Sequence, residues 1–303
     1  MFKEVIRSTF IGTLLISEFH RIEGAIYPRI VSDEVAVKRY YKRVSGKNLN
    51  LDNPILFSEK TNWYKLNSKK AIMQQCADKY AVREYVCACG FKDSLNELYG
   101  VYTDIKDIDL KKLPSEFVLK AAHGSHMSIT WPNTNYKWWQ VKLLLQSWIK
   151  QDIYWSGREW VYKEMPKRII AEKYLEDETG ELRDYKFFCY NGKPIFLQFD
   201  SGRFSGTHYR NYYDMSLNLL DITDEETIVN SELRPTDMET FKKMQHMASV
   251  LSKPFQFVRV DLYCVYGKIY FGEMTFFDGG GWSGFSKVEY EEKFGEPWEL
   301  EYK

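Results

Sequence analysis

The stretch from Asp184 to Phe199 constrains the fold of this chain more than any other. It consists of two apolar, aromatic-rich runs joined by Asn191-Gly192. An Asn-Gly pair readily adopts the positive backbone dihedrals that a two-residue turn between antiparallel strands requires. The sequence therefore predicts a β-hairpin here, and with it an antiparallel sheet.

Other elements follow from the periodicity of apolar residues. A second hairpin is predicted from Phe257 to Met274, with its turn at Tyr266-Gly267. Residues 1–100 have mainly helical patterns, and one helix is expected to start at residues 57–60 with Ser58 as its N-cap. Further on, we expect strands at 117–121 and 168–175 and a helix at 136–151. Helices followed by antiparallel strands predict an α+β fold.

Composition excludes several classes of protein. Hydrophobic residues make up 44% of the 303 residues, which is enough for a large core, and aromatic residues make up 17%, which excludes a disordered chain. Lys+Arg and Asp+Glu number 42 each, so no overall charge favours nucleic acid. The five cysteines are scattered and include no CxxC, so we expect reduced thiols in a cytoplasmic protein.

The apolar run from Phe10 to Ile16 is too short for a transmembrane segment. We expect it to form an amphipathic helix that packs on the protein. Loose, peripheral association with a membrane is the alternative.

Asp261 and Glu273 are the strongest candidates for a metal site. They lie six residues before and six residues after Gly267, so they should face each other across the second hairpin. Opposed carboxylates repel each other unless a cation lies between them, and such oxygen ligands suit Mg²⁺. The alternative is a pair of solvated charges on an exposed face of the sheet.

Two glycine-containing loops could bind anions. Gly279-Gly280-Gly281 would let backbone N–H groups approach a phosphate or carboxylate, although a merely flexible loop has the same composition. Lys120 ends an apolar strand and is followed by Gly124-Ser125. A lysine in that position needs an anionic partner or must extend to water, and the loop fits a phosphate lid.

Several cationic side chains lie between and within the hairpins. Arg203, His208 and Arg210 fall between them, and Arg259 lies two residues before Asp261. Guanidinium groups suit carboxylates and phosphates, whereas a charged surface loop is the alternative. Asp78-Lys79, at the start of a predicted helix, is by itself typical of a solvated pair.

These pieces occur in the order found in the ATP-grasp superfamily. The chain most closely resembles its teichuronopeptide-biosynthesis (TupA-like) branch, from about residue 30 to the C-terminus. The resembling stretches are residues 57–66, 117–125, 184–194 and 273–281. The resemblance implies an ATP-grasp fold, with a nucleotide held between two α+β lobes. It also implies three segments: a mainly helical N-terminal region (1–110), a small lobe with the phosphate loop (111–171) and a large lobe with the metal site (172–303).

The resemblance further implies that the cofactors are ATP and Mg²⁺. The implied nucleotide-binding residues are Lys79, Lys120, Gly124, Ser125, the hinge strand Glu172-Lys173-Tyr174-Leu175, Asp184 for the ribose and Lys186 for the phosphates. Asp261 and Glu273 match the two metal carboxylates. Thr275 stands where the family usually places an Asn ligand, which leaves the third ligand open.

The branch implies an enzyme that joins an amine, often an amino acid, to the uronic-acid carboxylate of a bacterial surface (capsular) polysaccharide or its precursor. The reaction would pass through an acyl phosphate, with Arg203, Arg210 and Arg259 holding the substrate carboxylate and the intermediate. An ATP-dependent sugar phosphotransferase and a non-catalytic nucleotide-binding protein of polysaccharide assembly are the alternatives. No nucleic-acid partner is expected.

Overall fold

The structure is a computed structural model that describes residues 10–26, 31–203, 206–224, 227–281 and 285–301. The chain divides into two compact units, each assembled from several stretches of sequence. Unit 1 comprises Met1–Ala36, Lys70–Val82 and Asn96–Tyr174, and unit 2 comprises Val37–Lys69, Arg83–Leu95 and Leu175–Lys303. Residues 1–110 contribute helices to both units and a strand to unit 1.

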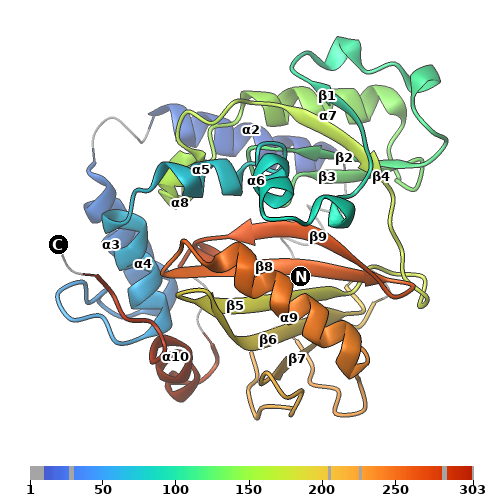
Figure 1. Cartoon of the computed structure of the whole chain (residues 1–303). Coiled ribbons are helices and arrows are strands. Elements are labelled where there is room, and N and C mark those ends of the chain that lie inside the picture. Colours follow the sequence, from blue (N-terminus) through green and yellow to red (C-terminus); the bar gives the residue numbers. More distant parts are fainter. Residues whose placement is uncertain (1–9, 27–30, 204–205, 225–226, 282–284, 302–303) are drawn as a thin grey trace. The chain divides into compact units, whose positions relative to one another are not determined.

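Unit 1 contains a four-stranded antiparallel sheet in the order β1-β4-β2-β3 (Figure 1). Its strands are β1 (Leu98–Tyr102), β2 (Phe117–Ala121), β3 (Ser128–Trp131) and β4 (Ile169–Lys173). Two helices, α2 (Phe10–Ile26) and α7 (Trp138–Lys150), pack side by side, and α7 also contacts β2. Leu119 and Ala171 of the sheet share a buried core with Leu144 of α7. The strands and the helix predicted for this region are confirmed.

Shorter elements complete unit 1. They are α5 (Ala71–Ala77), α8 (Tyr154–Gly157) and the 3-10 helices η3 (Ile105–Asp107), η4 (Leu110–Lys112) and η5 (Trp160–Tyr162). Helix α3 (Asp33–Ser45) begins in unit 1 and continues in unit 2. No helix among the described residues is both long and apolar enough to cross a bilayer.

Unit 2 contains a five-stranded antiparallel sheet in the order β7-β6-β5-β8-β9. Its strands are β5 (Asp184–Tyr190), β6 (Lys193–Ser201), β7 (Tyr209–Tyr213), β8 (Phe257–Val265) and β9 (Lys268–Thr275). Both predicted hairpins are confirmed. Their turns have positive φ at Asn191 (48°) and Gly192 (77°), and at Tyr266 (49°) and Gly267 (79°).

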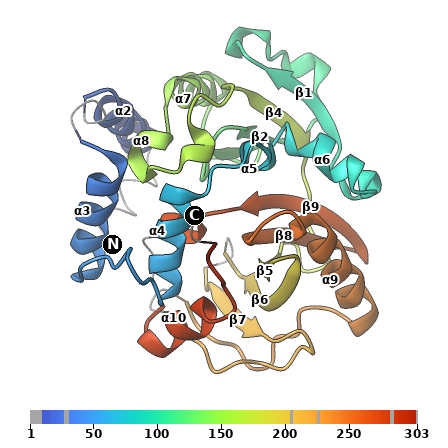
Figure 2. The same ribbon diagram turned by 60° about the vertical axis from the view of Figure 1, so that its left-hand side comes forward.

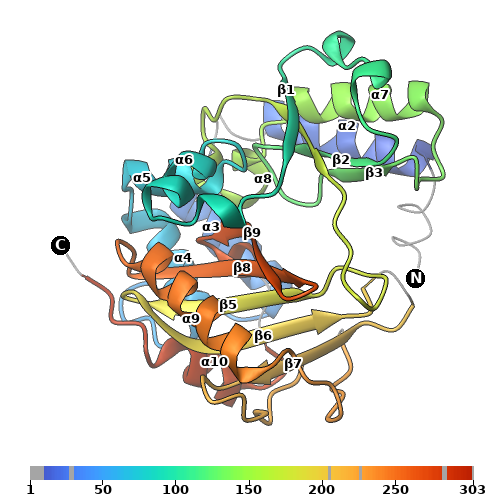
Figure 3. The same cartoon turned by 45° about the vertical axis from the view of Figure 1, so that its right-hand side comes forward.

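Helix α9 (Met238–Ser252) covers one face of this sheet, where it packs on β5, β6 and β8 (Figure 3). Asp237 is the N-cap of this helix, and its carboxylate accepts hydrogen bonds from the backbone N–H groups of Glu239 and Thr240. Phe241 and its neighbours at helical spacing are buried, and the Phe241 ring stacks on Phe187 at 5.7 Å. Odd-numbered side chains of β5 therefore face α9, and even-numbered ones face the opposite side.

An aromatic cluster covers one end of the opposite face. Phe188 and Phe257 of the sheet meet Phe57 of α4 (Phe57–Asn67) and Phe294 of α10 (Val288–Gly295). Figure 2 shows α4 and α10 next to each other. Helix α4 begins as predicted, but Ser58 is not its N-cap. The cap is Leu56, whose backbone N–H donates to the Glu59 carboxylate at 3.1 Å. Unit 2 also holds η2 (Lys92–Ser94), η6 (Asp278–Gly281) and most of α6 (Val82–Ala88).

Candidate active site

A row of polar residues crosses the face of the unit 2 sheet that α9 leaves uncovered. Lys186 of β5 pairs with Gln198 of β6 and with Asp261 of β8, and Asp261 pairs in turn with Glu273 of β9. Directly paired residues project from the same face of a sheet, so these side chains form one line. A second line runs from Arg210 through Asp200 to Asp184.

Asp261 and Glu273 do face each other, but the residue count that predicted this pairing was incomplete. The turn is centred between Tyr266 and Gly267, and a bulge between Asp261 and Leu262 shifts the register by one residue. Gly272 is the extra residue. A Cβ at that position would lie 2.9 Å from the main-chain oxygen of Asp261, so the bulge requires glycine. The bulge thus restores the opposition of the two carboxylates.

Asp261 is buried, with an exposed fraction of 2%, so it is not one of a pair of solvated charges. Its two carboxylate oxygens accept hydrogen bonds from Nε and Nη2 of Arg259 at 2.7 and 2.6 Å. Burial raises the pKa of Asp261 to about 6, against the opposing effects of Arg259 and Lys186. Glu273 is more accessible, and its Oε1 lies 3.8 Å from Nη2 of Arg259.

Arg259 connects the carboxylate pair to the glycine loop. Besides Asp261, it binds the carboxylate of Asp278, the first residue of η6, and donates to Oγ1 of Thr275 at 3.3 Å. Burial opposes the charge on Arg259, but Asp261 and Asp278 outweigh this effect and raise its pKa well above the usual value. Thr275, predicted at the third metal position, therefore lies beside Arg259 on the same face as the two carboxylates.

Lys186 lies among three carboxylates. Its Nζ is 2.9 Å from Asp184, 3.6 Å from Asp200 and 3.8 Å from Asp261. Asp184 also accepts a hydrogen bond from Nη1 of Arg203 at 2.7 Å. The sheet therefore brings together the predicted ribose, phosphate and substrate residues of unit 2.

Asp200 was missed by the sequence analysis, although it is central to this network. It is bound by Nε of Arg210 at 2.6 Å and by Nε2 of His208 at 3.3 Å. Burial acts to raise the pKa of Asp200, but His208, Lys186 and Arg210 together hold it well below its usual range. Arg210 also binds Asp224 at 2.6 Å. Asp200 lies opposite Arg210 because β6 pairs with β7, a pairing that the sequence analysis did not predict.

The network has more negative than positive groups. Its ion pairs join six carboxylates to four permanent cations, an excess of two negative charges when His208 is neutral. A divalent cation would balance this excess. Within the described ranges, no three His, Cys, Asp or Glu side chains are placed to enclose a metal ion. Asp261 and Glu273 instead offer the one or two carboxylates that Mg²⁺ uses when phosphates supply further ligands, so the donor set fits Mg²⁺.

Unit 1 positions the predicted phosphate-binding lysines. Nζ of Lys120 on β2 lies 3.0 Å from Oε2 of Glu172 on the neighbouring strand β4. Nζ of Lys79 donates to the main-chain oxygen of Gly124 at 2.7 Å, which ties this lysine to the loop after β2. Gly124 is buried and Ser125 is exposed. Each lysine thus has a partner that holds it near the end of β2.

Asp78 is not part of a solvated pair. Its exposed fraction is 2%, and it forms an ion pair with Arg168. It also accepts hydrogen bonds from the backbone N–H groups of Tyr80 and Ala81 at 2.8 and 3.1 Å. Asp78 therefore fixes the turn that carries Lys79.

The predicted hinge strand ends where the chain passes from one unit to the other. Strand β4 ends at Lys173, and the division falls between Tyr174 and Leu175. The backbone N–H of Lys173 donates to Glu97 at 3.0 Å, and its carbonyl accepts from Nδ2 of Asn96 at 2.8 Å. Any ligand that hydrogen-bonds to the main chain of Lys173 would compete with these two contacts.

Helix α4 holds the glycine loop in place. Nδ2 of Asn62 donates to the carbonyl of Gly281 at 2.7 Å, and Nζ of Lys65 donates to the carbonyl of Gly280 at 2.5 Å. Lys65 has an exposed fraction of only 1%. Residues 278–281 are thus bound at one end by Arg259 and at the other by α4. The sequence analysis assigned no role to Asn62 and Lys65. The available signal for their role was their spacing of three residues, which places two polar side chains on the same side of an aromatic-rich helix.

Replacing Lys65 by Met is expected to loosen this loop. The variant keeps the buried aliphatic stem but leaves carbonyl groups without their donor, which costs about 1–3 kcal/mol of unfolding free energy. Urea unfolding measures the loss. Lys69→Met is the control, because Lys69 is exposed just beyond the same helix. Equal stability of the two variants would contradict a role for Lys65 in holding the loop.

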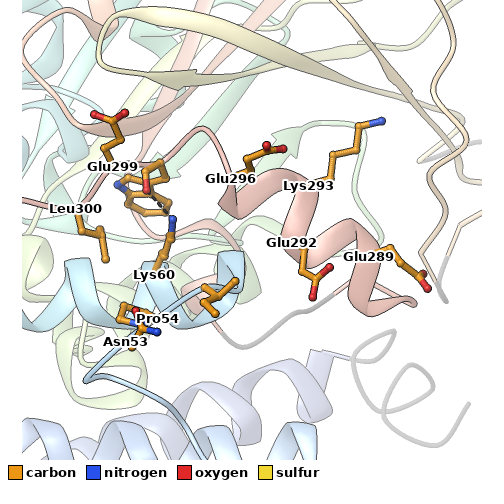
Figure 4. A pocket seen from close by; sticks show the side chains of 11 residues that line it. Asn53, Pro54, Lys60, Glu289, Glu292, Lys293, Glu296, Glu299 and Leu300 are labelled. Atoms are coloured by element: carbon orange, nitrogen blue, oxygen red, sulfur yellow. Dashed lines mark hydrogen bonds between the residues drawn. The ribbon is translucent and has the colours of Figure 1, made fainter.

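An open cavity of about 740 Å³ lies elsewhere in unit 2, against α10 (Figure 4). Four glutamates line it, Glu289, Glu292, Glu296 and Glu299, together with Lys60 and Lys293. Nζ of Lys60 donates to the main-chain oxygens of Gly295 and Trp298 at 2.9 and 2.7 Å, so Lys60 joins α4 to the C-terminal segment. None of the predicted site residues lines this cavity.

Comparison with known proteins gives one match to a family. The model of the family described as TupA-like ATPgrasp matches residues 59–299. No curated protein sequence matches the chain significantly.

Solved structures of ATP-grasp enzymes resemble the chain at low sequence identity. D-alanine–D-alanine ligase from Bacillus anthracis is 14% identical, with a TM-score of 0.41, over 72% of this chain and 58% of that one. N5-carboxyaminoimidazole synthetase from Staphylococcus aureus, complexed with ADP, is 15% identical, with a TM-score of 0.42, over 71% and 50%. The ATP-grasp ligase PsnB is 8% identical, with a TM-score of 0.41, over 79% and 65%. The chain thus matches less than two thirds of the length of each.

Proposed function

The chain belongs to the TupA-like ATP-grasp family, and on this basis we propose that it is an ATP-dependent ligase that joins a carboxylate to an amine. The observation that carries the proposal is the pair of opposed carboxylates formed by the buried Asp261 and the more accessible Glu273, with Arg259 and Lys186 beside Asp261. This arrangement suits a divalent cation that is shared with the phosphates of a nucleotide.

The proposed reaction has two steps. An oxygen of the substrate carboxylate attacks the γ-phosphorus of ATP, the bond from that phosphorus to the β,γ-bridging oxygen breaks, and ADP leaves. The amine nitrogen then attacks the acyl carbon of the acyl phosphate, phosphate leaves, and the nitrogen loses a proton as the amide forms. The first step brings two anions together, so the main task of the protein is to offset negative charge.

The two units would divide this task. Lys79 and Lys120 of unit 1 are proposed to bind ATP phosphates, and the loop at Gly124 and Ser125 to shield the acyl phosphate from water. Lys186 of unit 2 would offset phosphate charge, and Asp184 would bind the ribose. Mg²⁺ held by Asp261 and Glu273 would neutralise phosphate oxygens when bound.

For the adenine, the proposed binding segment is Glu172–Leu175. Because the main chain of Lys173 already has partners, we expect its neighbours Glu172, Tyr174 and Leu175 to make most of the adenine contacts.

We further propose that the carboxylate substrate is a uronic acid of a bacterial surface polysaccharide or its precursor, and that the amine is an amino acid or a related compound. Arg203, Arg210 and Arg259 are the proposed carboxylate-binding groups. Among them, Arg203 has the most exposed side chain, at 38%, and is therefore the most accessible to a substrate. All five cysteines are free, which supports a reducing, cytoplasmic location where ATP is available.

Product analysis tests the proposal directly. The protein is incubated with ATP, Mg²⁺, a uronic acid and a mixture of amino acids, and the products are identified by mass spectrometry. A ligase yields ADP, phosphate and an amide. A phosphorylated sugar with ADP would assign the protein to the phosphotransferases instead. ATP binding without turnover in any such mixture would identify a nucleotide-binding assembly protein.

Replacing Lys120 by Met is expected to raise the KM for ATP at least about tenfold, because one charged contact to the phosphates is worth roughly 1.5–3 kcal/mol. Steady-state ADP release at varied ATP concentration measures the change. Lys111→Met is the control, since Lys111 is an exposed lysine of the same unit. An unchanged KM in Lys120→Met would remove Lys120 from the nucleotide site.

A further inference from the structure

Helix α2 has an apolar stripe along its outer side. Ile11, Leu15, Phe19 and Ile22 are exposed by 68%, 63%, 63% and 49%. Their spacing of three and four residues places them on one side of the helix over about three turns, or roughly 16 Å. Phe10 and Leu14, on another side of the helix, pack against the core of unit 1. Among the described residues, the helix therefore has one apolar side that packs on the core of unit 1 and a second apolar side that is largely exposed to solvent.

Helix α7 also has exposed apolar side chains close to α2. It packs beside α2, and the Phe10 ring lies 5.8 Å from the ring of Trp139. Trp139 and Leu143 are exposed by 54% and 46%. Glu18 of α2 instead faces α7, where its Oε1 accepts a hydrogen bond from Ser147 at 3.2 Å. We define the outer apolar surface as Ile11, Leu15, Phe19, Ile22, Trp139 and Leu143.

The charged residues of α7 are positive. Helix α7 contains no acidic residue, and its two charged residues, Lys142 and Lys150, are both exposed. Lys137, the residue before the helix, is exposed as well. In a chain whose formal net charge is +0, a helix with only lysines is a local basic feature. An apolar stripe beside tryptophan and lysine is the composition of helices that lie in the interface of a bilayer.

We propose that the outer apolar surface binds the protein peripherally to an anionic phospholipid bilayer, with α2 lying in the plane of the membrane. The apolar side chains enter the boundary between headgroups and acyl chains, and the lysines of α7 contact anionic headgroups. A symmetric contact between two copies through this surface fits less well, because it would bring the lysines of both copies together. The proposal does not depend on the proposed enzymatic activity.

Vesicle co-sedimentation of the full chain tests the proposal. The protein is expected to bind vesicles of phosphatidylcholine with phosphatidylglycerol, and to bind pure phosphatidylcholine vesicles much less. The double variant Leu15→Ser/Phe19→Ser should lower the partition coefficient at least about tenfold, because both side chains lose apolar area that the bilayer would bury. Lys142→Gln and Lys150→Gln should each lower it roughly fivefold at low salt.

Val44→Ser/Ile228→Ser is the matched control, because both residues are exposed apolar side chains of unit 2. It should bind vesicles like the unmodified protein, and thermal unfolding checks that all variants fold. Three results would overturn the proposal: no vesicle binding, equal loss in the control variant, or equal binding to neutral vesicles. A dimer, detected by light scattering, that the Leu15→Ser/Phe19→Ser variant dissociates without any vesicle binding would assign the surface to a second copy instead.

Discussion

The Asp261→Asn variant should lose ATP turnover by about 10³-fold while it remains folded. The amide lacks the negative charge with which the carboxylate attracts Mg²⁺, and in a water-poor site the loss of one stabilising group commonly costs 10²- to 10³-fold in rate. Burial raises the pKa of Asp261 to about 6, so the folded protein already disfavours the charge that the variant removes. Arg259 keeps Asp278 as a partner. We therefore expect the Tm to change by only about 5 °C.

Two measurements separate a metal role from a structural one. ADP release by the variant is measured over a range of Mg²⁺ concentrations, and thermal unfolding is recorded in parallel. Asp221→Asn is the control, because Asp221 is an exposed aspartate of the same unit. If Asp261→Asn turned over ATP within a few-fold of the unmodified protein, Asp261 would not be a metal ligand.

The Phe57→Ala variant should lose about 4 kcal/mol of unfolding free energy, the largest stability effect that we expect from a single substitution. The Phe57 ring lies between 5.3 and 6.3 Å from the rings of Phe188, Phe257, Phe285, Phe294 and Trp298. It therefore connects α4, α10 and the sheet. Truncation would leave a cavity that these surrounding elements could fill only in part.

Guanidinium unfolding followed by tryptophan fluorescence measures this loss. Tyr266→Ala is the control, because Tyr266 is an aromatic residue with an exposed fraction of 73%. It should change stability by less than about 0.5 kcal/mol. Similar losses in both variants would show that the aromatic cluster does not hold unit 2 together.

Local sequence patterns predicted much of the fold. The Asn191-Gly192 and Tyr266-Gly267 turns fixed both hairpins, because few residue pairs adopt two successive positive φ angles. Apolar runs located β2, β4 and α7. These are short-range signals, in which the residues that decide the structure are close together in the sequence.

The candidate site was predicted only in part. The pairing of Asp261 with Glu273 is correct, but it depends on the bulge at Gly272, which counting from the turn does not include. Asp200, Asn62 and Lys65 were given no role. Asn62 and Lys65 contact a loop more than 200 residues away, so no local pattern could link them to it.

The sequence by itself determined the two hairpins, the order of the motifs and the family to which that order belongs, because turn chemistry and side-chain alternation act over a few residues. Only the tertiary structure decided which charges meet. Strand pairing placed Lys186 among three carboxylates. Long-range packing placed α4 against the glycine loop and distributed stretches of the first 110 residues over both units. These contacts depend on burial and on the register between distant segments, which also shift the pKa values of Asp200 and Asp261.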